Sequence, residues 1–569
     1  MNLNDPSPTL FRSGYTWPWR PAARAALPLL AYFCLHLAIY LHFGPQFNDD
    51  AFITFRYAER LAQGHGFTFN DGAPPVLGTT TPLWTLLLAG ARRMGLGLVT
   101  AVALFSALGA AVFCEAGRRL MARLDAPLLG VLFGPTLLLY DLWLWSLLMG
   151  METMLYMALL ALTLERITAA RPITAGLIGA LAALTRPDGA LALLLALGVA
   201  WHRNGRTGLR ATALATLILL PWLIYAALSF GAVIPHSVEA KQFIHPAGFF
   251  EAAGAAWILL YRDAFGRIAL GLAAVGLIVV ALRRRRAWTL PAWIAAYALG
   301  LAASGVAVQL FPWYVTPLAG MVWLLATLAL AEAGHLLAER LTSRPFGLAP
   351  RTVATLLCIG LWLVIVAQSS GFWRRNGLAF PIAYTYKERI YADLARQLRP
   401  RLAPGTRVLV GEVGVFGYLL PDCHLIDSAG LNSPRILELR RQDPKGGRTF
   451  YEQVPDWLRA ATRRMRPDYI ISLGLLIGGN QILSDPEALP AYDLVEARPV
   501  GTRQHLLILR RQPEQGSPAK ANLPNEPAVS LNHQNAYERM NPYPLIKCKP
   551  SHIRSGCKNA PPVRPVRLP

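Results

Sequence analysis

Apolar blocks alternate with short polar loops over the first 370 residues, and this pattern predicts a chain that crosses a membrane many times. A hydrocarbon core about 30 Å thick needs about 20 apolar residues in a helix, although deeply packed helices can be shorter. We therefore predict about eleven transmembrane helices. They cover residues 26–44, 99–117, 127–144, 151–164, 173–186, 188–201, 211–230, 268–282, 289–309, 315–336 and 352–370.

The stretch 173–201 has two interpretations, because Arg186-Pro187-Asp188 interrupts it. It could form one long kinked helix or two short helices that meet in a turn. A single span would break the alternation that keeps the later basic loops on one side of the membrane. We therefore favour two short helices with the turn on the outer side.

Arginines set the predicted orientation, because cytoplasmic loops of membrane proteins are enriched in basic residues. With residues 1–25 in the cytoplasm, about eighteen arginines fall inside and roughly eight basic residues fall outside. The first apolar block has no small-residue cleavage site after it, so we interpret it as a retained signal anchor. The outer segments are then 45–98, 231–267 and 371–512.

The segment 371–512 is expected to be a small α/β domain outside the cytoplasm, after a membrane domain over 26–370. Helical periodicity covers 386–398 and 456–465, and the expected strands are 407–411, 425–426, 469–473 and 506–509. Residues 513–569 are rich in Pro, Asn and Lys without periodicity, which predicts disorder. The fold class is thus mostly α and polytopic, with one small α/β domain.

Composition agrees with a lipid environment. Only 15% of the residues are charged and 54% are hydrophobic, whereas a soluble chain has about 25% charged residues. The net charge of +22 does not indicate a nucleic-acid partner, because the arginines flank apolar blocks instead of gathering on one domain.

The segment NDDAFITFRYAERL, which starts at residue 48, follows the first span and carries the most informative charges. A helix here would place Asp49, Arg56 and Arg60 near one face, with Asp50 beside them. Carboxylates next to arginines suit a site that deprotonates a hydroxyl and holds an anionic leaving group. The alternative is a plain helix start, where acids favour the dipole and arginines contact lipid phosphate.

Polar residues in four other segments are candidates for substrate binding. Thr79, Thr80 and Thr81 precede Pro-Leu-Trp and could bind a sugar or cap a short helix. Arg186 and Asp188 interrupt an apolar stretch, where ionisable residues are functional candidates or an internal ion pair. The second outer segment adds His236 and Lys241 in IPHSVEAK. A short outer loop between two spans adds Trp313 and Tyr314 in PWYVTPL, which fit an interfacial aromatic belt or could stack on a sugar.

Taken together, these motifs resemble the polyprenyl-phosphate-dependent membrane glycosyltransferases of the C-type fold. The resemblance covers roughly residues 26–510 and runs through NDDAFITFRYAERLAQGHGFTFN, GTTTPLW, GMETMLY, TRPDG, IPHSVEAK, PWYVTPL, GEVGVFGYLL and LIDSAGLNSP. It is closest to the branch with the terminal arabinofuranosyltransferases. Protein mannosyltransferases and the aminoarabinose transferases of lipid A are more distantly similar.

The resemblance implies roles for particular residues. Asp49 and Asp50 correspond to the acidic catalytic pair, without a choice between them as the base. Arg186 corresponds to the basic residue that binds the carrier phosphate, and Lys241 to a common lysine. His-Ser replaces the more usual Asn-Thr before Lys241, which leaves the role of that lysine open.

The implied activity is sugar transfer from a polyprenyl-phosphate donor to a glycan, lipid or protein of the cell envelope, at the outer face of a bacterial inner membrane. Arg56 and Arg60 join Arg186 and Lys241 as candidates for the donor phosphate. Relatives with a metal near the acidic site make a divalent ion an alternative, held by Asp49 or Asp50, but the sequence has no ligand cluster. A transporter or flippase for a lipid-linked or anionic substrate is the alternative function.

Overall fold

The computed structural model describes residues 19–123, 127–233, 235–244, 246–261, 264–284, 287–306, 311–342, 350–370, 386–443, 453–500 and 505–513. Two compact units divide the chain, Met1–Asn525 and Glu526–Pro569, and every described residue belongs to the first. The tail predicted to be disordered lies outside the described residues, apart from its first residue.

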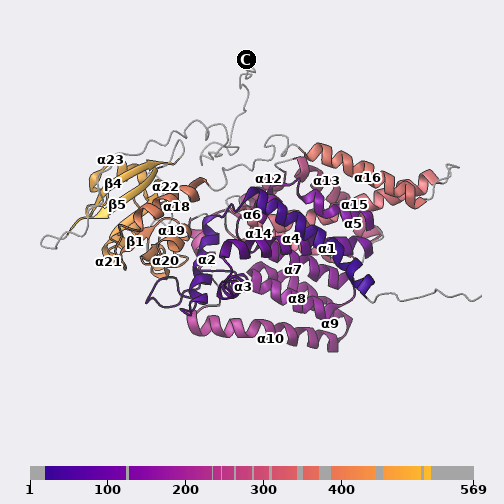
Figure 1. Ribbon diagram of the computed structural model, residues 1–569, viewed down its shortest axis with the longest axis horizontal. Helices are drawn as coiled ribbons and strands as arrows, with labels where there is room; N and C mark the ends of the chain where they lie inside the picture. Colours follow the sequence, from indigo (N-terminus) through magenta and orange to yellow (C-terminus); the bar gives the residue numbers. More distant parts are fainter. Residues whose placement is uncertain are drawn as a thin grey trace, which may run out of the picture. The chain divides into compact units, whose positions relative to one another are not determined.

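Helices form most of the described chain up to residue 370, and they follow the predicted apolar blocks (Figure 1). They are α1 (Trp19–Phe43), α2 (Asp49–Ala62), α3 (Pro82–Arg93), α4 (Leu98–Arg123), α5 (Pro127–Leu137), α6 (Asp141–Leu148), α7 (Thr153–Thr168), α8 (Pro172–Thr185), α9 (Ala190–Arg203), α10 (Gly205–Phe230), α11 (His236–Ile244), α12 (Phe249–Tyr261), α13 (Ala264–Leu282), α14 (Thr289–Ala303), α15 (Thr316–Thr342) and α16 (Pro350–Ser369). The sequence did not predict α12, which falls inside the expected outer loop 231–267.

Five of the described helices are long and apolar enough to cross a membrane. A sixth span results if α5 and α6, which are bent by 70° at a short break, are counted together. Helices α8, α12 and α14 are apolar but shorter. The mostly helical, membrane-spanning class is therefore confirmed, whereas the number of about eleven spans stays a prediction.

Helices α8 and α9 pack against each other as an antiparallel pair. A Cβ on Gly179 would lie 2.9 Å from Cα of Leu193, and one on Gly189 would lie 2.3 Å from the carbonyl of Ala182. These close approaches need glycine at both positions, and the 3-10 turn η1 (Pro187–Gly189) joins the two helices. The chain thus forms two short helices at this place, as the charge pattern predicted.

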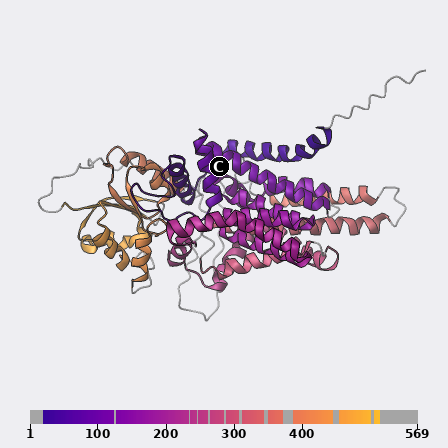
Figure 2. The same ribbon diagram turned by 90° about the horizontal axis from the view of Figure 1, so that it is seen from below.

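Large helices of the membrane part pack side by side around one apolar core. Helix α4 packs on α1 and α7, and α13 packs on α15. Figure 2 shows the helices of this part running alongside one another. The fully buried side chains include Trp143, Trp293 and Trp323. Small residues allow the close approach, since a Cβ on Gly109 would lie 2.6 Å from the backbone of Met154 in the neighbouring chain segment.

The second part is a five-stranded mixed sheet in the order β2-β1-β3-β5-β4. Its elements are α18 (Tyr386–Leu398), β1 (Arg407–Val410), α19 (Gly414–Leu419), β2 (His424–Asp427), α20 (Pro434–Arg441), α21 (Asp456–Met465), β3 (Tyr469–Leu473), α22 (Gly474–Ile477), α23 (Gly479–Ser484), β4 (Tyr492–Pro499) and β5 (His505–Arg511). Strand β1 pairs in parallel with β2 and β3, whereas β5 runs antiparallel to β3 and β4.

The α/β part contains the predicted helices and strands, and it adds helices α20, α22 and α23 and strand β4, which were not predicted. The expected helices 386–398 and 456–465 have the predicted bounds, and four strands lie at or near the expected positions. Strand β4 was not predicted because its side chains are mostly exposed, with the burial pattern of a sheet edge rather than an apolar run.

Helix α2 is the element on which the α/β part packs. Tyr57 in α2 lies with its hydroxyl 2.8 Å from Oδ1 of Asn432, and both side chains are buried. Asn70 exchanges two hydrogen bonds with the backbone of Leu425, at 2.8 and 2.9 Å. One apolar cluster also joins Ile53 of α2 to side chains of the sheet. Residues 45–98 and the α/β part therefore share a core.

The predicted orientation can be tested by thiol labelling of intact cells. In a variant without native cysteines, we expect Pro74→Cys, which is exposed in the first outer segment, to react with an impermeant reagent. His202→Cys, exposed at the end of α9, should react only after lysis. The opposite pattern would reverse the orientation derived from the arginines.

Gly414 controls the contact between α2 and the α/β part. A Cβ at this position would lie 1.8 Å from the backbone oxygen of Asp49, so Gly414→Ala must displace backbone. We expect a loss of about 1–3 kcal/mol in stability, as for other overpacked sites, measured by unfolding of the purified protein in detergent. Gly271→Ala is the matched control, because a Cβ there meets nothing within 4 Å. Equal losses in both variants would contradict the expectation.

Candidate functional site

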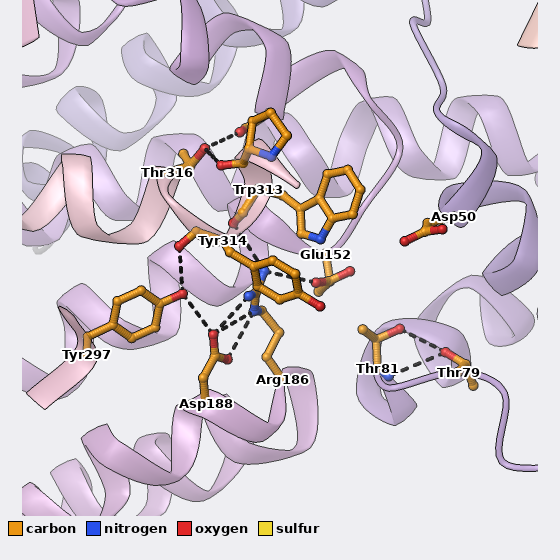
Figure 3. Close-up of polar contacts among 12 residues, drawn as sticks. Asp50, Thr79, Thr81, Glu152, Arg186, Asp188, Tyr297, Trp313, Tyr314 and Thr316 are labelled. Atoms are coloured by element: carbon orange, nitrogen blue, oxygen red, sulfur yellow. Dashed lines mark hydrogen bonds and ion pairs between the residues drawn. The ribbon is translucent and has the colours of Figure 1, made fainter. Parts of the chain in front are cut away.

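A cavity of about 610 Å³ lies where α2, α11 and α14 meet two short turns, η1 and η4 (Pro312–Tyr314). Several segments far apart in the sequence bring polar side chains to its wall (Figure 3). The residues predicted from the sequence that line it are Asp50, Thr79, Thr80, Thr81, Arg186, Asp188, Lys241, Trp313 and Tyr314. The structure therefore gathers most of the candidates into one place.

Arg186 is the most enclosed charge of this cavity, with 2% of its surface exposed. Its Nε and Nη2 donate to the Asp188 carboxylate at 3.0 and 2.8 Å. Its Nη1 lies 3.4 Å from Oε1 of Glu152 and 3.3 Å from the backbone oxygen of Trp313. The guanidinium group also lies 4.9 Å from the ring centre of Tyr314. These contacts compensate the cost of burying a charge.

Asp188 is held in turn by Tyr297 of α14. The Tyr297 hydroxyl lies 2.9 Å from Oδ2 of Asp188 and 2.9 Å from the backbone oxygen of Tyr314. Figure 3 shows this hydroxyl between the two acceptors. One phenol has a single proton to donate, so the two acceptors share it. The network joins α14, η1 and η4 around the guanidinium.

Lys241 and Asp50 form the second charged pair of the cavity. The Lys241 Nζ lies 3.3 Å from Oδ2 of Asp50 and 3.2 Å from the Tyr314 hydroxyl. The ammonium group also faces the rings of Phe311 at 4.6 Å and Trp313 at 5.4 Å. Burial lowers the pKa of Lys241, but Tyr314 and Asp50 outweigh it and the pKa is raised, so the amine stays cationic. Three aromatic side chains and the Asp50 carboxylate thus surround the ammonium group of Lys241.

Asp49 does not line the cavity, although it neighbours Asp50. Its two carboxylate oxygens accept hydrogen bonds from the backbone N–H groups of Gly414 and Val415, both at 2.9 Å. Burial, followed by Glu412, raises the pKa of Asp49, whereas Lys387 and the two amides act against this. Of the two acids, Asp50 therefore lines the cavity, whereas Asp49 fastens α2 to α19.

Arg56 and Arg60 also lie away from the cavity. Arg56 donates to the backbone oxygens of Phe69 and Pro421, at 3.0 and 2.9 Å. Arg60 donates to Thr68 at 2.8 Å and pairs with Asp71. Both arginines are buried, and their donors order the loop after α2. The structure therefore places these two candidates for the donor phosphate in structural contacts.

The three threonines form a turn at the cavity wall. Oγ1 of Thr79 lies 3.1 Å from Oγ1 of Thr81 and accepts from the Thr81 N–H at 3.3 Å. Thr81 precedes α3 as its N-cap residue, but its side chain makes no capping hydrogen bond. Capping, the alternative use of these hydroxyls, is therefore not what Thr81 does here. His236 begins α11, but its side chain lies outside the described residues.

Glu152 and Tyr297 line the cavity and were not predicted as site residues. Glu152 comes directly before α7, is 3% exposed, and contacts Arg186. A signal existed in the sequence, because its carboxylate interrupts apolar residues in GMETMLY, as Arg186 does in its own stretch. Tyr297 gave no signal, since a tyrosine within an apolar block is common in membrane helices.

The described residues of the cavity offer no set of metal ligands. Among the described residues, no group of three or more His, Cys, Asp or Glu side chains could hold a metal ion. Asp50 contacts Lys241, and Glu152 and Asp188 contact Arg186, so each cavity carboxylate has a cationic partner. These residues do not fit a divalent ion.

Solved membrane glycosyltransferases share the fold of this chain. The apo structure of ArnT from Cupriavidus metallidurans matches with a TM-score of 0.52 at 14% identity, over 86% of this chain and 98% of that chain. The archaeal oligosaccharyltransferase AglB from Archaeoglobus fulgidus, in complex with an inhibitory peptide and a dolichol-phosphate, matches with a TM-score of 0.50 at 12% identity, over 83% and 73%. The chain therefore has the C-type fold of membrane glycosyltransferases, as its motifs predicted.

Two further comparisons concern the α/β part and an arabinofuranosyltransferase. Residues 382–515, which hold the α/β part, match a family described as a domain of unknown function (DUF8728). The arabinofuranosyltransferase AftD from Mycobacteria matches at 17% identity over 86% of this chain and 40% of that chain, with a TM-score of 0.44. No curated protein sequence matches the chain. The closer likeness to one branch of these enzymes stays a prediction.

Asp49 and Asp50 have different partners, so we expect a change to asparagine to affect stability differently at the two positions. Asp49→Asn replaces an acceptor oxygen with an amide group that faces a backbone N–H, so one buried hydrogen bond is lost. We expect a loss of about 1–3 kcal/mol in stability, measured as a lower unfolding temperature in detergent. Asp50→Asn is the matched control, since the Asp50 side chain is 27% exposed and the amide oxygen can still accept from Lys241, so we expect a smaller loss. Similar unfolding temperatures for both variants would contradict this assignment.

Proposed function

We propose that this protein is a glycosyltransferase that moves a sugar from a polyprenyl-phosphate donor to an acceptor hydroxyl of the cell envelope. The observation that carries the proposal is the cavity in which Asp50 lies next to Lys241 and across from Arg186. A base and fixed cations on one wall are the groups that such a displacement requires. The shared fold supports it, because AglB, with that fold, was solved with a dolichol-phosphate.

The donor phosphate is assigned to Lys241 and Arg186. Both cations are fixed by aromatic rings and carboxylates, so they can bind an anion without first becoming ordered. The polyprenyl chain needs an apolar exit from the same cavity. Exposed small residues of α9 and α14 line the wall there, namely Ala190, Gly300 and Ala303. We assign the lipid path to this side.

Asp50 is assigned as the base. The acceptor hydroxyl oxygen attacks the anomeric carbon, and its proton moves to the Asp50 carboxylate. The bond between that carbon and the phosphate oxygen breaks, and the phosphate leaves with the electron pair. Lys241 and Arg186 stabilise the charge that develops on the leaving oxygen. Thr79 and Thr81 offer hydroxyls to the sugar from the opposite wall.

The proposed location is the outer face of a bacterial inner membrane, with residues 371–512 outside the cytoplasm. Activated nucleotide sugars are made in the cytoplasm, so an outer enzyme needs a donor that has already crossed. A sugar on a polyprenyl phosphate meets this requirement. The arginine bias of the loops supports the same orientation.

Substitution of Asp50 tests the proposal. We expect Asp50→Asn to lower kcat by about 100-fold or more, the size of a lost general base, with folding unchanged. The measurement is single-turnover transfer by the purified protein from a panel of polyprenyl-phosphate sugars, with products identified by mass spectrometry. Asp393→Asn, an exposed residue of α18, is the control and should react at the wild-type rate. Transfer by Asp50→Asn at that rate would remove Asp50 from the mechanism, and no transfer by the wild type from any donor would reject the proposed activity.

A further inference from the structure

Helix α11 is attached on two sides. On the cavity side it carries Lys241, and Gln242 donates to the backbone oxygen of Ser304 at 2.9 Å. On the other side Ala240 is fully buried in the apolar cluster shared with the α/β part. A nine-residue helix with contacts of both kinds cannot move without changing one of them.

The polar link between α11 and the α/β part is the ion pair of Glu239 and Arg441. Nε and Nη2 of Arg441 donate to the two Glu239 oxygens, each at 2.6 Å, which is a bidentate arrangement. Side-chain exposure is 53% for Arg441 and 35% for Glu239. Single exposed ion pairs contribute little to stability, but bidentate pairs fix geometry. This ion pair therefore fixes the position of α11 relative to α20 more than it stabilises the fold.

Helix α20, which carries Arg441, makes firm contacts with the rest of the α/β part. The preceding Arg440 is buried, donates to the backbone oxygen of Ser428 at 3.1 and 2.8 Å, and lies 4.0 Å over the Trp457 ring. Ile436 and Leu437 of α20 are buried as well. Helix α20 is thus fixed to the sheet, and the position of the Arg441 guanidinium follows the position of the α/β part.

The loop before α20 reaches the same cavity. Leu431 lines the cavity wall, and its neighbour Asn432 contacts Tyr57 of α2. A Cβ on Gly78, in the wall beside the threonines, would lie 1.9 Å from Oδ1 of Asn432, so the loop fits tightly there. Whatever occupies the cavity beside Leu431 therefore meets the segment that leads directly into α20.

We propose that Glu239 and Arg441 are positioning residues that hold Lys241 at the donor phosphate, and that they couple the α/β part to donor binding. The inference rests on the proposed function, because it assigns the phosphate to Lys241. Glu239 lies two residues before Lys241 on one helix, so a shift of its carboxylate moves the ammonium group relative to Asp50 and Arg186. The α/β part thereby sets how strongly the cavity binds the donor.

Charge exchange tests the coupling in the full-length protein in lipid nanodiscs, with equilibrium binding of radiolabelled undecaprenyl phosphate as the readout. We expect Glu239→Arg and Arg441→Glu each to raise the Kd by about threefold to tenfold, the range of coupled pairs. The double variant restores the pair with the net charge unchanged, and its Kd should return to within about twofold of the wild type. Arg435→Glu reverses an exposed charge on the same helix and controls for long-range charge.

A second cycle shows whether the pair acts through Lys241. In a Lys241→Met background, Arg441→Glu should change the Kd no further, whereas a purely structural role would lower the unfolding temperature and weaken binding in both backgrounds. Arg441→Lys keeps the charge without the bidentate fork, so it should lie between wild type and Arg441→Glu. If the wild type does not bind undecaprenyl phosphate, the proposed function fails. If it binds and the double variant is no better than the single variants, the coupling is wrong.

Discussion

The buried guanidinium of Arg186 is the constraint around which the cavity is built. A charge with 2% exposure is stable only when nearby groups replace the water it has lost. Asp188 supplies the counter-charge, Glu152 a second carboxylate, and Trp313 a backbone oxygen. These partners come from the α8–α9 turn, the start of α7, and η4. The hydrogen bonds that the Arg186 guanidinium requires thus determine where these three segments meet.

Helix geometry gives the two neighbouring aspartates, Asp49 and Asp50, different surroundings. Neighbouring positions of an α-helix point about 100° apart, so Asp49 and Asp50 cannot face the same surroundings. Asp49 faces α19 and receives two backbone N–H groups, whereas Asp50 faces the cavity and Lys241. Close packing at Gly414 permits the first contact. One acid therefore attaches the α/β part, and the other remains available for chemistry.

Hydrophobic spacing predicted the helices well, because a helix that crosses the hydrocarbon core must be apolar whether it faces lipid or protein. The turn at Arg186 was predicted because a single span there would have put the later basic loops on the wrong side of the membrane. Strand β4 and the roles of Arg56 and Arg60 were not predictable. An exposed edge strand lacks an apolar run, and a buried arginine cannot be told from a phosphate ligand until its acceptors are known. For Arg56 these are the backbone oxygens of Phe69 and Pro421.

The charges of the cavity constrain how it can work under the proposed function. Asp50, Glu152 and Asp188 place three carboxyl groups in the cavity beside the two cations, Arg186 and Lys241. Asp188 holds Arg186 through two short hydrogen bonds, whereas Asp50 holds Lys241 at 3.3 Å. An arriving phosphate therefore displaces the weaker pair first. Once Lys241 binds the phosphate, the Asp50 carboxylate loses its ammonium partner and can accept the proton of a hydroxyl. Donor binding and activation of the base then follow from the same exchange of partners.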